Sequence, residues 1–326
     1  PGTECAMSRL GRLVLSLPIP EPVRARAERL FECFAPPKHV GTEKLIAAAN
    51  ANKADAVVIS FGIPMTADAI ARLPASVKII ASTSVGFDHI DVAAANARGV
   101  AVGITPDAVT DATADVTLLL MLGACRRAKE HIRSMDQAWS VRNGFFDGLG
   151  VDLTGKTLGI VGMGRIGRAV AERCRGFRMP ILYHNRNRLS PDLEGNAGYF
   201  ASLDEMLPHC QVLSLNLPGG QGVIMTAEKF ALLPKGALFV NSARGGLVDE
   251  DALIDALKSG QLVGAGLDVF KSEPNYDTRV NDLPNTFLLP HVGTATVETR
   301  TRMANMALDN VEAVLSGRPA PYPATL

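Results

Sequence analysis

The sequence predicts an α/β protein built from two doubly wound parallel sheets. Short apolar runs alternate with amphipathic helical stretches along all 326 residues, which is typical of parallel strands joined by helical crossovers. The alternation falls into two series, and the second begins at Thr157, directly before a glycine-rich turn. We therefore expect a smaller, flavodoxin-like sheet followed by a larger sheet of six strands.

The first series contains four expected strands separated by helices. The strands are Arg12–Ser16, Ala56–Ser60, Lys78–Ala81 and Val100–Val102, and the helices are Glu21–Phe31, Ala67–Leu73 and Val92–Arg98. A single long apolar helix is expected over about Asp111–Ser134, because the Thr105-Pro106-Asp107 segment before it supplies a proline and capping residues.

The second series contains six expected strands. They are Thr157–Val161, Pro180–Tyr183, Val212–Asn216, Ala237–Asn241, Val263–Asp268 and Thr286–Leu289, with helices that include Arg168–Phe177, Asp249–Ser259 and Thr296–Leu315. Six strands with helical crossovers make a complete Rossmann dinucleotide-binding domain. We expect that domain at residues 108–296, and a discontinuous substrate-binding domain at 7–107 and 297–326, with Met7 as the native start.

Composition excludes several classes of function. Lys plus Arg and Asp plus Glu both number 33, so the zero net charge favours neither nucleic acid nor a membrane surface as a partner. The five cysteines are scattered without a CxxC pair, which indicates reduced thiols in a cytoplasm and no metal site. No apolar run is long enough to span a membrane, and no signal peptide opens the chain.

A glycine motif marks the expected dinucleotide site. The segment Gly162-Met-Gly164-Arg165-Ile166-Gly167 contains GxGxxG, directly follows an apolar strand and opens a helical run. The first glycine would allow a tight turn, the second would let the backbone approach a pyrophosphate, and the third would permit close helix–strand packing. Phosphate would bind the N–H groups at the start of the helix, so Arg165 and Ile166 join the three glycines as cofactor-binding candidates.

The strand after this motif favours NADPH over NADH. An acid that would bind the ribose 2′-OH is expected at its end, but no acid occurs between Tyr183 and Asp192. Arg186 and Arg188 could instead pair with a 2′-phosphate, and Asn185 could hydrogen-bond to it. Arg186 is the stronger candidate; the alternative is that the arginines flank the adenine or face solvent.

Three residues could catalyse the reduction of a 2-keto acid by the cofactor. The reaction needs a cation for the carboxylate, a proton donor for the carbonyl oxygen, and a group that keeps the donor charged. Arg244, Glu273 and His291 each follow one of the last three expected strands, at the sheet edge where ligands bind. One such residue after a strand is usually a capping or solvated residue, whereas three on successive strands favour an active site.

Three segments around these residues resemble the D-isomer-specific 2-hydroxyacid dehydrogenases. They are Asn241-Ser-Ala-Arg244-Gly-Gly, Gly266-Leu-Asp-Val-Phe270 with Glu273-Pro274, and Leu289-Pro-His291-Val-Gly-Thr-Ala-Thr296. The resemblance extends from about Leu10 onward and is strongest to the glyoxylate/hydroxypyruvate reductase branch, including hydroxyphenylpyruvate reductase-like members. It implies that Arg244 binds the substrate carboxylate, that His291 protonates the keto oxygen, and that Glu273 orients the imidazole and favours its charged form.

The resemblance also implies further contacts. Backbone N–H groups of Val85 and Gly86 would bind the substrate carboxylate, and Asp268 would bind the nicotinamide carboxamide. The remaining cofactor candidates are Thr113, Pro218 and Ala243, although the chain has Asn216-Leu-Pro218 where the family often has His-x-Pro. Dimer arms of the family occupy the region of Trp139, so we expect a homodimer in which Trp139 packs at the interface rather than entering the neighbouring pocket.

The predicted function is NADPH-dependent reduction of glyoxylate, hydroxypyruvate or phenylpyruvate-type keto acids to D-2-hydroxy acids. One alternative is an NAD-dependent dehydrogenase of phosphoglycerate, which would generally have an acid where this chain has His184–Arg186, or of formate, which would usually have a different polar residue in the role of Glu273. Another is a dinucleotide-sensing protein similar to the corepressors built on this fold, which the catalytic residues alone do not exclude.

Overall fold

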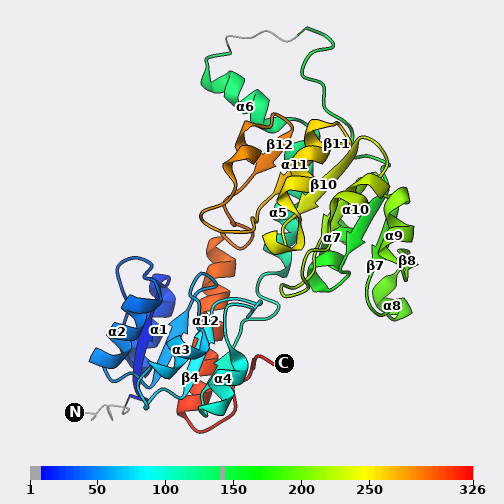
Figure 1. The fold of residues 1–326 in the computed structure, drawn as a ribbon. Coiled ribbons are helices and arrows are strands. Elements are labelled where there is room, and N and C mark those ends of the chain that lie inside the picture. Colours follow the sequence, from blue (N-terminus) through cyan, green and yellow to red (C-terminus); the bar gives the residue numbers. More distant parts are fainter. Residues whose placement is uncertain (1–8, 140–143, 326) are drawn as a thin grey trace, which may run out of the picture. The chain divides into compact units, whose positions relative to one another are not determined.

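A computed structural model of the chain describes residues 9–139 and 144–325 (Figure 1). These residues form two compact units, and the chain passes between them at 109/110 and again at 294/295. The expected start at Met7 lies outside the described residues. The predicted fold class is confirmed: the protein is α/β, and each unit contains one parallel sheet.

The first unit is a five-stranded parallel sheet with the flavodoxin-like order β2-β1-β3-β4-β5. Its strands are β1 (Arg12–Leu15), β2 (Glu32–Phe34), β3 (Ala56–Ile59), β4 (Ile79–Ser82) and β5 (Ala101–Gly103). Its helices are α1 (Glu21–Leu30), α2 (Thr42–Ala51), α3 (Ala67–Ala71), α4 (Val92–Ala97) and α12 (Val297–Leu315). The predicted four strands omitted β2, a three-residue edge strand that buries no residue fully, and the prediction also omitted α2.

The second unit is a seven-stranded parallel sheet with the order β12-β11-β10-β9-β6-β7-β8. Its strands are β6 (Leu158–Val161), β7 (Ile181–His184), β8 (Gly198–Phe200), β9 (Val212–Leu215), β10 (Ala237–Asn241), β11 (Leu262–Leu267) and β12 (Thr286–Leu288). The strand order reverses between β6 and β9, which is the switch point where open α/β sheets bind ligands. The prediction of six strands missed β8, another short edge strand without a fully buried residue.

Helices and 3₁₀ turns connect these strands. The α-helices of the second unit are α5 (Thr110–Cys125), α6 (Ala128–Asp136), α7 (Arg165–Arg175), α8 (Pro191–Glu194), α9 (Leu203–Met206), α10 (Ala227–Leu232) and α11 (Glu250–Lys258). The 3₁₀ turns are η1 (Leu207–His209), η2 (Gly245–Leu247) and η3 (Thr278–Asp282). Within residues 9–139 and 144–325, none of the helices combines the length and apolar character that a bilayer span requires.

The expected single helix over Asp111–Ser134 is wrong, because two helices meet at Arg127. This residue adopts a left-handed conformation with φ of 53°, which interrupts the helical hydrogen bonding. The first helix, α5, packs against β11, where a Cβ on Gly266 would lie only 2.6 Å from the carbonyl oxygen of Leu120. The second, α6, buries no residue and leads away from the sheet (Figure 1). Lys129 connects α6 to the segment before β12 by donating hydrogen bonds to the carbonyl oxygens of Asn281 and Leu283.

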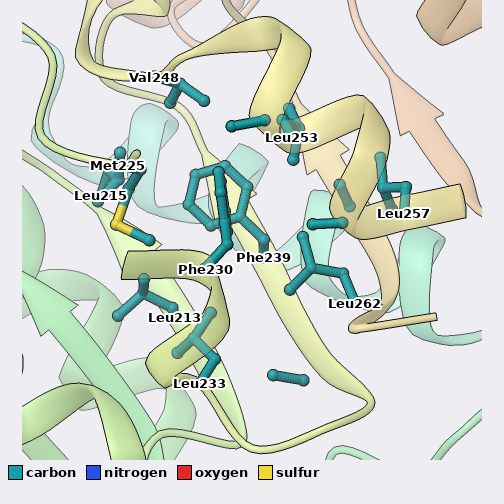
Figure 2. Packing of buried hydrophobic residues seen from close by; sticks show 14 of the residues in the cluster. Leu213, Leu215, Met225, Phe230, Leu233, Phe239, Val248, Leu253, Leu257 and Leu262 are labelled. Carbon is teal, nitrogen blue, oxygen red and sulfur yellow. The ribbon is translucent and has the colours of Figure 1, made fainter. Parts of the chain in front are cut away.

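A hydrophobic cluster beside β10 fixes the strands that end at the candidate site (Figure 2). Phe239 of β10 and Phe230 of α10 meet edge to face, with ring centroids 5.3 Å apart. Leu253 of α11 and Leu262 of β11 are buried in the same cluster. Burial of each such side chain contributes about 1.5–3 kcal/mol, so this core holds β10 and β11 in place.

Candidate active site

The three glycines of the turn between β6 and α7 have different structural roles. Gly162 has a positive φ of 96°, and a Cβ there would lie 2.8 Å from the carbonyl oxygen of Asn216 at the end of β9. A Cβ on Gly167 would collide with the carbonyl oxygen of Gly162, so Gly167 permits the close packing of α7 on β6. Gly164 has open space where its Cβ would be. This opening and the absence of a side-chain cap on α7 fit a bound pyrophosphate.

The other residues of the predicted phosphate site extend the same turn. Arg165 and Ile166 begin α7, so their N–H groups belong to the first helical turn, which has no intrahelical acceptor. Pro218 lies two residues beyond Asn216, whose carbonyl oxygen borders Gly162. These placements agree with the geometry of a dinucleotide turn, and the individual contacts stay predictions.

Asn185 connects the ends of β6 and β7. Its Oδ1 accepts a hydrogen bond of 2.7 Å from the N–H of Met163, inside the glycine turn. The hydroxyl of Tyr199 donates to its carbonyl oxygen at 3.4 Å. Asn185 therefore holds the shape of the turn, a role that the sequence did not indicate, and its contact with a 2′-phosphate stays a prediction.

The two arginines beyond β7 have different surroundings. Arg188 forms an ion pair with Glu194, with Nη2 3.0 Å from Oε2, and its guanidinium lies 5.7 Å from the centroid of the Tyr199 ring. Glu194 is 5% exposed, and the Arg188 hydrogen bond lowers the pKa of its carboxyl group. Arg186 is exposed and has no side-chain partner within the described residues. Sequence reasoning missed Glu194 because it lies ten residues beyond the end of β7.

A short loop after β10 presents Arg244. Asn241, the last residue of β10, accepts from the N–H of Ala243 at 3.0 Å and donates from Nδ2 to the carbonyl oxygen of Arg244 at 2.9 Å. A Cβ on the next residue, Gly245, would collide with the backbone of Phe270. The Arg244 loop therefore lies directly against the segment that follows β11.

That segment carries Glu273, which pairs with His291. The Nδ1 of His291 lies 2.6 Å from Oε2 of Glu273, and Oε1 accepts from the N–H of Phe270 at 2.8 Å. Burial raises the pKa of Glu273, but the His291 and Phe270 hydrogen bonds and the nearby Arg244 charge together lower it below the ordinary glutamate value. Glu273 therefore stays ionised beside the imidazole. The structure thus brings the three predicted catalytic residues together.

Asp268 and Thr113 border the turn that contains His291. Asp268 is 1% exposed, and its carboxylate oxygens accept from the N–H groups of Val292 and Gly293, both at 2.8 Å. Burial raises the pKa of Asp268 even though these two hydrogen bonds act in the opposite direction. A Cβ on Gly293 would lie 3.1 Å from Oδ2 of Asp268 and 3.8 Å from Oγ1 of Thr113.

The predicted substrate loop lies in the first unit, directly after β4. The Ser84 hydroxyl donates to the carbonyl oxygen of Gly86 at 2.7 Å, and the hydroxyls of Ser82 and Ser84 are 2.6 Å apart. Two serines that the sequence reading did not single out therefore shape the Val85–Gly86 loop. In the described part of the chain, no group of three or more His, Cys, Asp or Glu side chains is placed to bind a metal ion.

Comparison with known proteins decides the family. Residues 118–293 match the model described as the NAD binding domain of D-isomer specific 2-hydroxyacid dehydrogenases. The chain belongs to the D-isomer specific 2-hydroxyacid dehydrogenase family. The predicted resemblance is thereby confirmed, and the protein is an oxidoreductase.

Individual members of this dehydrogenase family support the assignment over nearly the whole chain. Glycerate dehydrogenase of Hyphomicrobium methylovorum is 39% identical over 319 residues, covering 95% of this chain and 98% of that protein. Glyoxylate reductase of Thermococcus kodakarensis is 43% identical over 265 residues, covering 78% and 77%. The NADPH-dependent glyoxylate/hydroxypyruvate reductase of Sinorhizobium meliloti, solved with NADP and malonate, has a TM-score of 0.84 at 32% identity, covering 97% of each chain.

The contact between the Arg244 loop and Phe270 yields a prediction about stability. Gly245→Ala should lower the free energy of unfolding by about 1–3 kcal/mol, because the added methyl group must displace a packed backbone segment. The adjacent Gly246→Ala is the matched control: open space surrounds that position, so its effect should stay within about 0.5 kcal/mol. Urea denaturation of both variants measures the difference, and equal stabilities would show that the two segments are not in tight contact.

Proposed function

We propose that the chain reduces small 2-keto acids to D-2-hydroxy acids, with NADPH as the hydride donor. The observation that carries this proposal is the 2.6 Å pairing of His291 Nδ1 with Glu273 Oε2, next to the Arg244 loop. A cation, a proton donor and an orienting carboxylate are the groups that reduction of a 2-keto acid requires. They lie on loops after β10, β11 and β12, at the edge of the sheet where this fold binds ligands.

Each residue has a defined task in this proposal. Arg244 binds the substrate carboxylate and polarises the keto oxygen, which suits the planar guanidinium better than a lysine ammonium. Glu273 holds Nδ1 of His291, so the proton given to the keto oxygen comes from Nε2. In the first unit, the N–H groups of Val85 and Gly86 are the proposed donors to the carboxylate.

The cofactor residues follow the Rossmann turn. When bound, the nicotinamide supplies the hydride that reduces the carbonyl carbon. The glycine turn with the N–H groups of Arg165 and Ile166 would hold the pyrophosphate, while Thr113 and Asp268 would lie at the nicotinamide end. Pro218 and Ala243 complete the proposed set. The open position above Gly164 fits this assignment, because a backbone without a side chain can approach a phosphate closely.

The proposed preference for NADPH rests on Arg186. It is exposed at the end of β7, where NAD-binding members of this fold use an acid for the ribose hydroxyls. Arg188 is paired with Glu194, so Arg186 is the better partner for a 2′-phosphate. The NADP complex of the Sinorhizobium meliloti relative supports the same choice.

The proposed substrates are glyoxylate and hydroxypyruvate, with phenylpyruvate-type acids as larger candidates. Relatives described as glycerate dehydrogenase and glyoxylate reductase support the small keto acids. A cytoplasmic location is proposed because Cys33, Cys125, Cys174 and Cys210 are free thiols among the described residues, as expected in a reducing compartment.

A homodimer is proposed from the segment that follows α6. Large apolar side chains are exposed there, including Trp139 at 68%, Phe145 at 88% and Phe146 at 80%. A concentration of exposed aromatic residues is typical of a protein interface rather than of a solvated surface. The second copy of this chain is the proposed partner, with Trp139 packed at the interface.

Turnover measurements test the reaction. Glyoxylate and hydroxypyruvate should oxidise NADPH in the presence of the protein, and His291→Ala should lower kcat by about 10²–10⁴ because the general acid is lost. The decrease in NADPH absorbance gives both rates. Binding of NADPH without its oxidation by any of the keto acids would contradict the proposal and favour a dinucleotide-sensing protein.

Two arginine variants test the cofactor preference. Arg186→Ala should weaken NADPH binding about tenfold or more while leaving NADH binding nearly unchanged, because only NADPH carries the 2′-phosphate. Arg188→Ala is the comparison: it removes the cationic partner of the buried Glu194 and leaves that carboxylate only the Tyr183 hydrogen bond, so thermal stability should decrease. Fluorescence titration with both cofactors measures the affinities, and equal losses for Arg186→Ala would rule out the phosphate contact.

Sedimentation equilibrium tests the homodimer. The wild-type chain should sediment with twice the mass of one chain at micromolar concentration. Replacing Phe145 and Phe146 together with serine should raise the dimer dissociation constant by at least about tenfold, because two large anchors are removed. Leu193→Ser, which changes an exposed leucine on α8, is the control. A wild-type monomer would overturn the proposal.

A further inference from the structure

Two buried polar residues lie at the ends of neighbouring strands, outside the set of three that performs the proposed chemistry. Asn241 is the last residue of β10, and Asp268 directly follows β11; each is only 1% exposed. Polar groups at this depth are costly unless they are hydrogen-bonded. Both side chains form hydrogen bonds with the backbone of a loop that carries a proposed catalytic residue.

The amide of Asn241 closes the Arg244 loop by acting as a donor and an acceptor at once. Its Oδ1 accepts from the N–H of Ala243, and its Nδ2 donates to the carbonyl oxygen of Arg244. An aspartate of the same size could accept but not donate, and an apolar residue could do neither. The position therefore requires an amide.

The carboxylate of Asp268 closes the His291 turn by acting as two acceptors. It receives the N–H groups of Val292 and Gly293, while its own carbonyl oxygen accepts from the N–H of His291 at 2.8 Å. His291 adopts a left-handed conformation with φ of 54°, which costs a residue with a side chain about 1–2 kcal/mol. Three hydrogen bonds from one residue offset that cost. An asparagine at this position would lose one of the two acceptors.

The two residues are also bonded to each other. The N–H of Asp268 donates to the carbonyl oxygen of Asn241 at 3.0 Å, as the final rung between β10 and β11. A continuous series of hydrogen bonds therefore runs from the Arg244 loop through Asn241 and Asp268 to the His291 turn. The loops that carry Arg244 and His291 are consequently fixed relative to each other by these hydrogen bonds.

We propose that Asn241 and Asp268 are the positioning residues of the active site, Asn241 for Arg244 and Asp268 for His291. This inference rests on the proposed keto-acid reduction. A displacement of about 1 Å in such a site costs on the order of 10²-fold in rate, so the loss of a single loop hydrogen bond should be measurable in turnover.

The two isosteric exchanges, Asn241→Asp and Asp268→Asn, should have different kinetic effects. Asn241→Asp should raise the keto-acid KM by about tenfold or more, because Arg244 holds the substrate already in the ground state. Asp268→Asn should lower kcat by about 10–100-fold with little change in KM, because His291 acts only as the proton is transferred. Its solvent deuterium isotope effect on kcat should rise as proton transfer becomes slower, which a smaller folded fraction would not produce.

Matched controls change the same charges elsewhere. Asn285 directly precedes β12, at the N-terminal end of that strand and away from the loops of the site, and Asp255 lies on the exposed face of α11. The variants Asn285→Asp and Asp255→Asn should both retain wild-type kinetics. Rates are referred to the number of NADPH-binding sites, so that inactive protein is not counted. If Asp268→Asn keeps its kcat and isotope effect within about twofold, or if Asn241→Asp leaves KM unchanged, the assignment is overturned.

Amide hydrogen exchange separates this inference from the proposed reaction. In Asp268→Asn, the Val292 and Gly293 amides should exchange at least about tenfold faster than in the wild type, whichever substrate the enzyme uses. Unchanged protection of these amides would overturn the positioning role even in an active reductase. Wild-type protein that turns over no keto acid, but shows the faster exchange in Asp268→Asn, would reject the proposed reaction and retain the hydrogen-bonded series.

Discussion

The parallel register of β10, β11 and β12 is the constraint on which the candidate active site depends. Asn241 pairs with Leu267 across the first pair of strands, and Leu267 pairs with Leu288 across the second, so the three strands end side by side. Parallel strands have their carboxyl ends at one edge of the sheet, so their pairing alone brings the three loops together. A register slip of one residue would reverse the side-chain faces and separate Arg244, Glu273 and His291.

The two carboxylates at this edge have opposite electrostatic environments. Glu273 pairs with the His291 imidazole and lies near the Arg244 guanidinium, and its pKa is lowered despite partial burial. Asp268 is buried more deeply, and its direct partners are two backbone N–H groups, so burial outweighs them and raises its pKa. The two carboxylates therefore have different partners: Glu273 contacts the His291 imidazole, and Asp268 accepts hydrogen bonds from the backbone of the turn that contains His291.

Much of the fold and site followed from local patterns in the sequence. All six strands predicted for the second unit are present, because buried parallel strands are continuous apolar runs, and the catalytic candidates followed from the ends of those runs. The edge strands β2 and β8 were not predicted because each has only three residues, none of them fully buried. The break at Arg127 and the partnership of Arg188 with Glu194 depend on contacts through space. Asn241 belongs to one of the segments that resemble the dehydrogenase family, but nothing in the local sequence shows which backbone groups its amide binds.

The Tyr183–Arg188–Glu194 network makes the second arginine beyond β7 part of the fold. The Tyr183 hydroxyl donates to Glu194 at 3.0 Å and accepts from the N–H of Leu189 at 3.1 Å, so the network fixes the path of the chain after the strand. Arg186 takes no part in it. The stability of the fold therefore depends on position 188, which carries the ion pair with the buried Glu194. Under the proposed function, a substitution at the exposed position 186 would change the coenzyme preference while the Rossmann sheet stays intact.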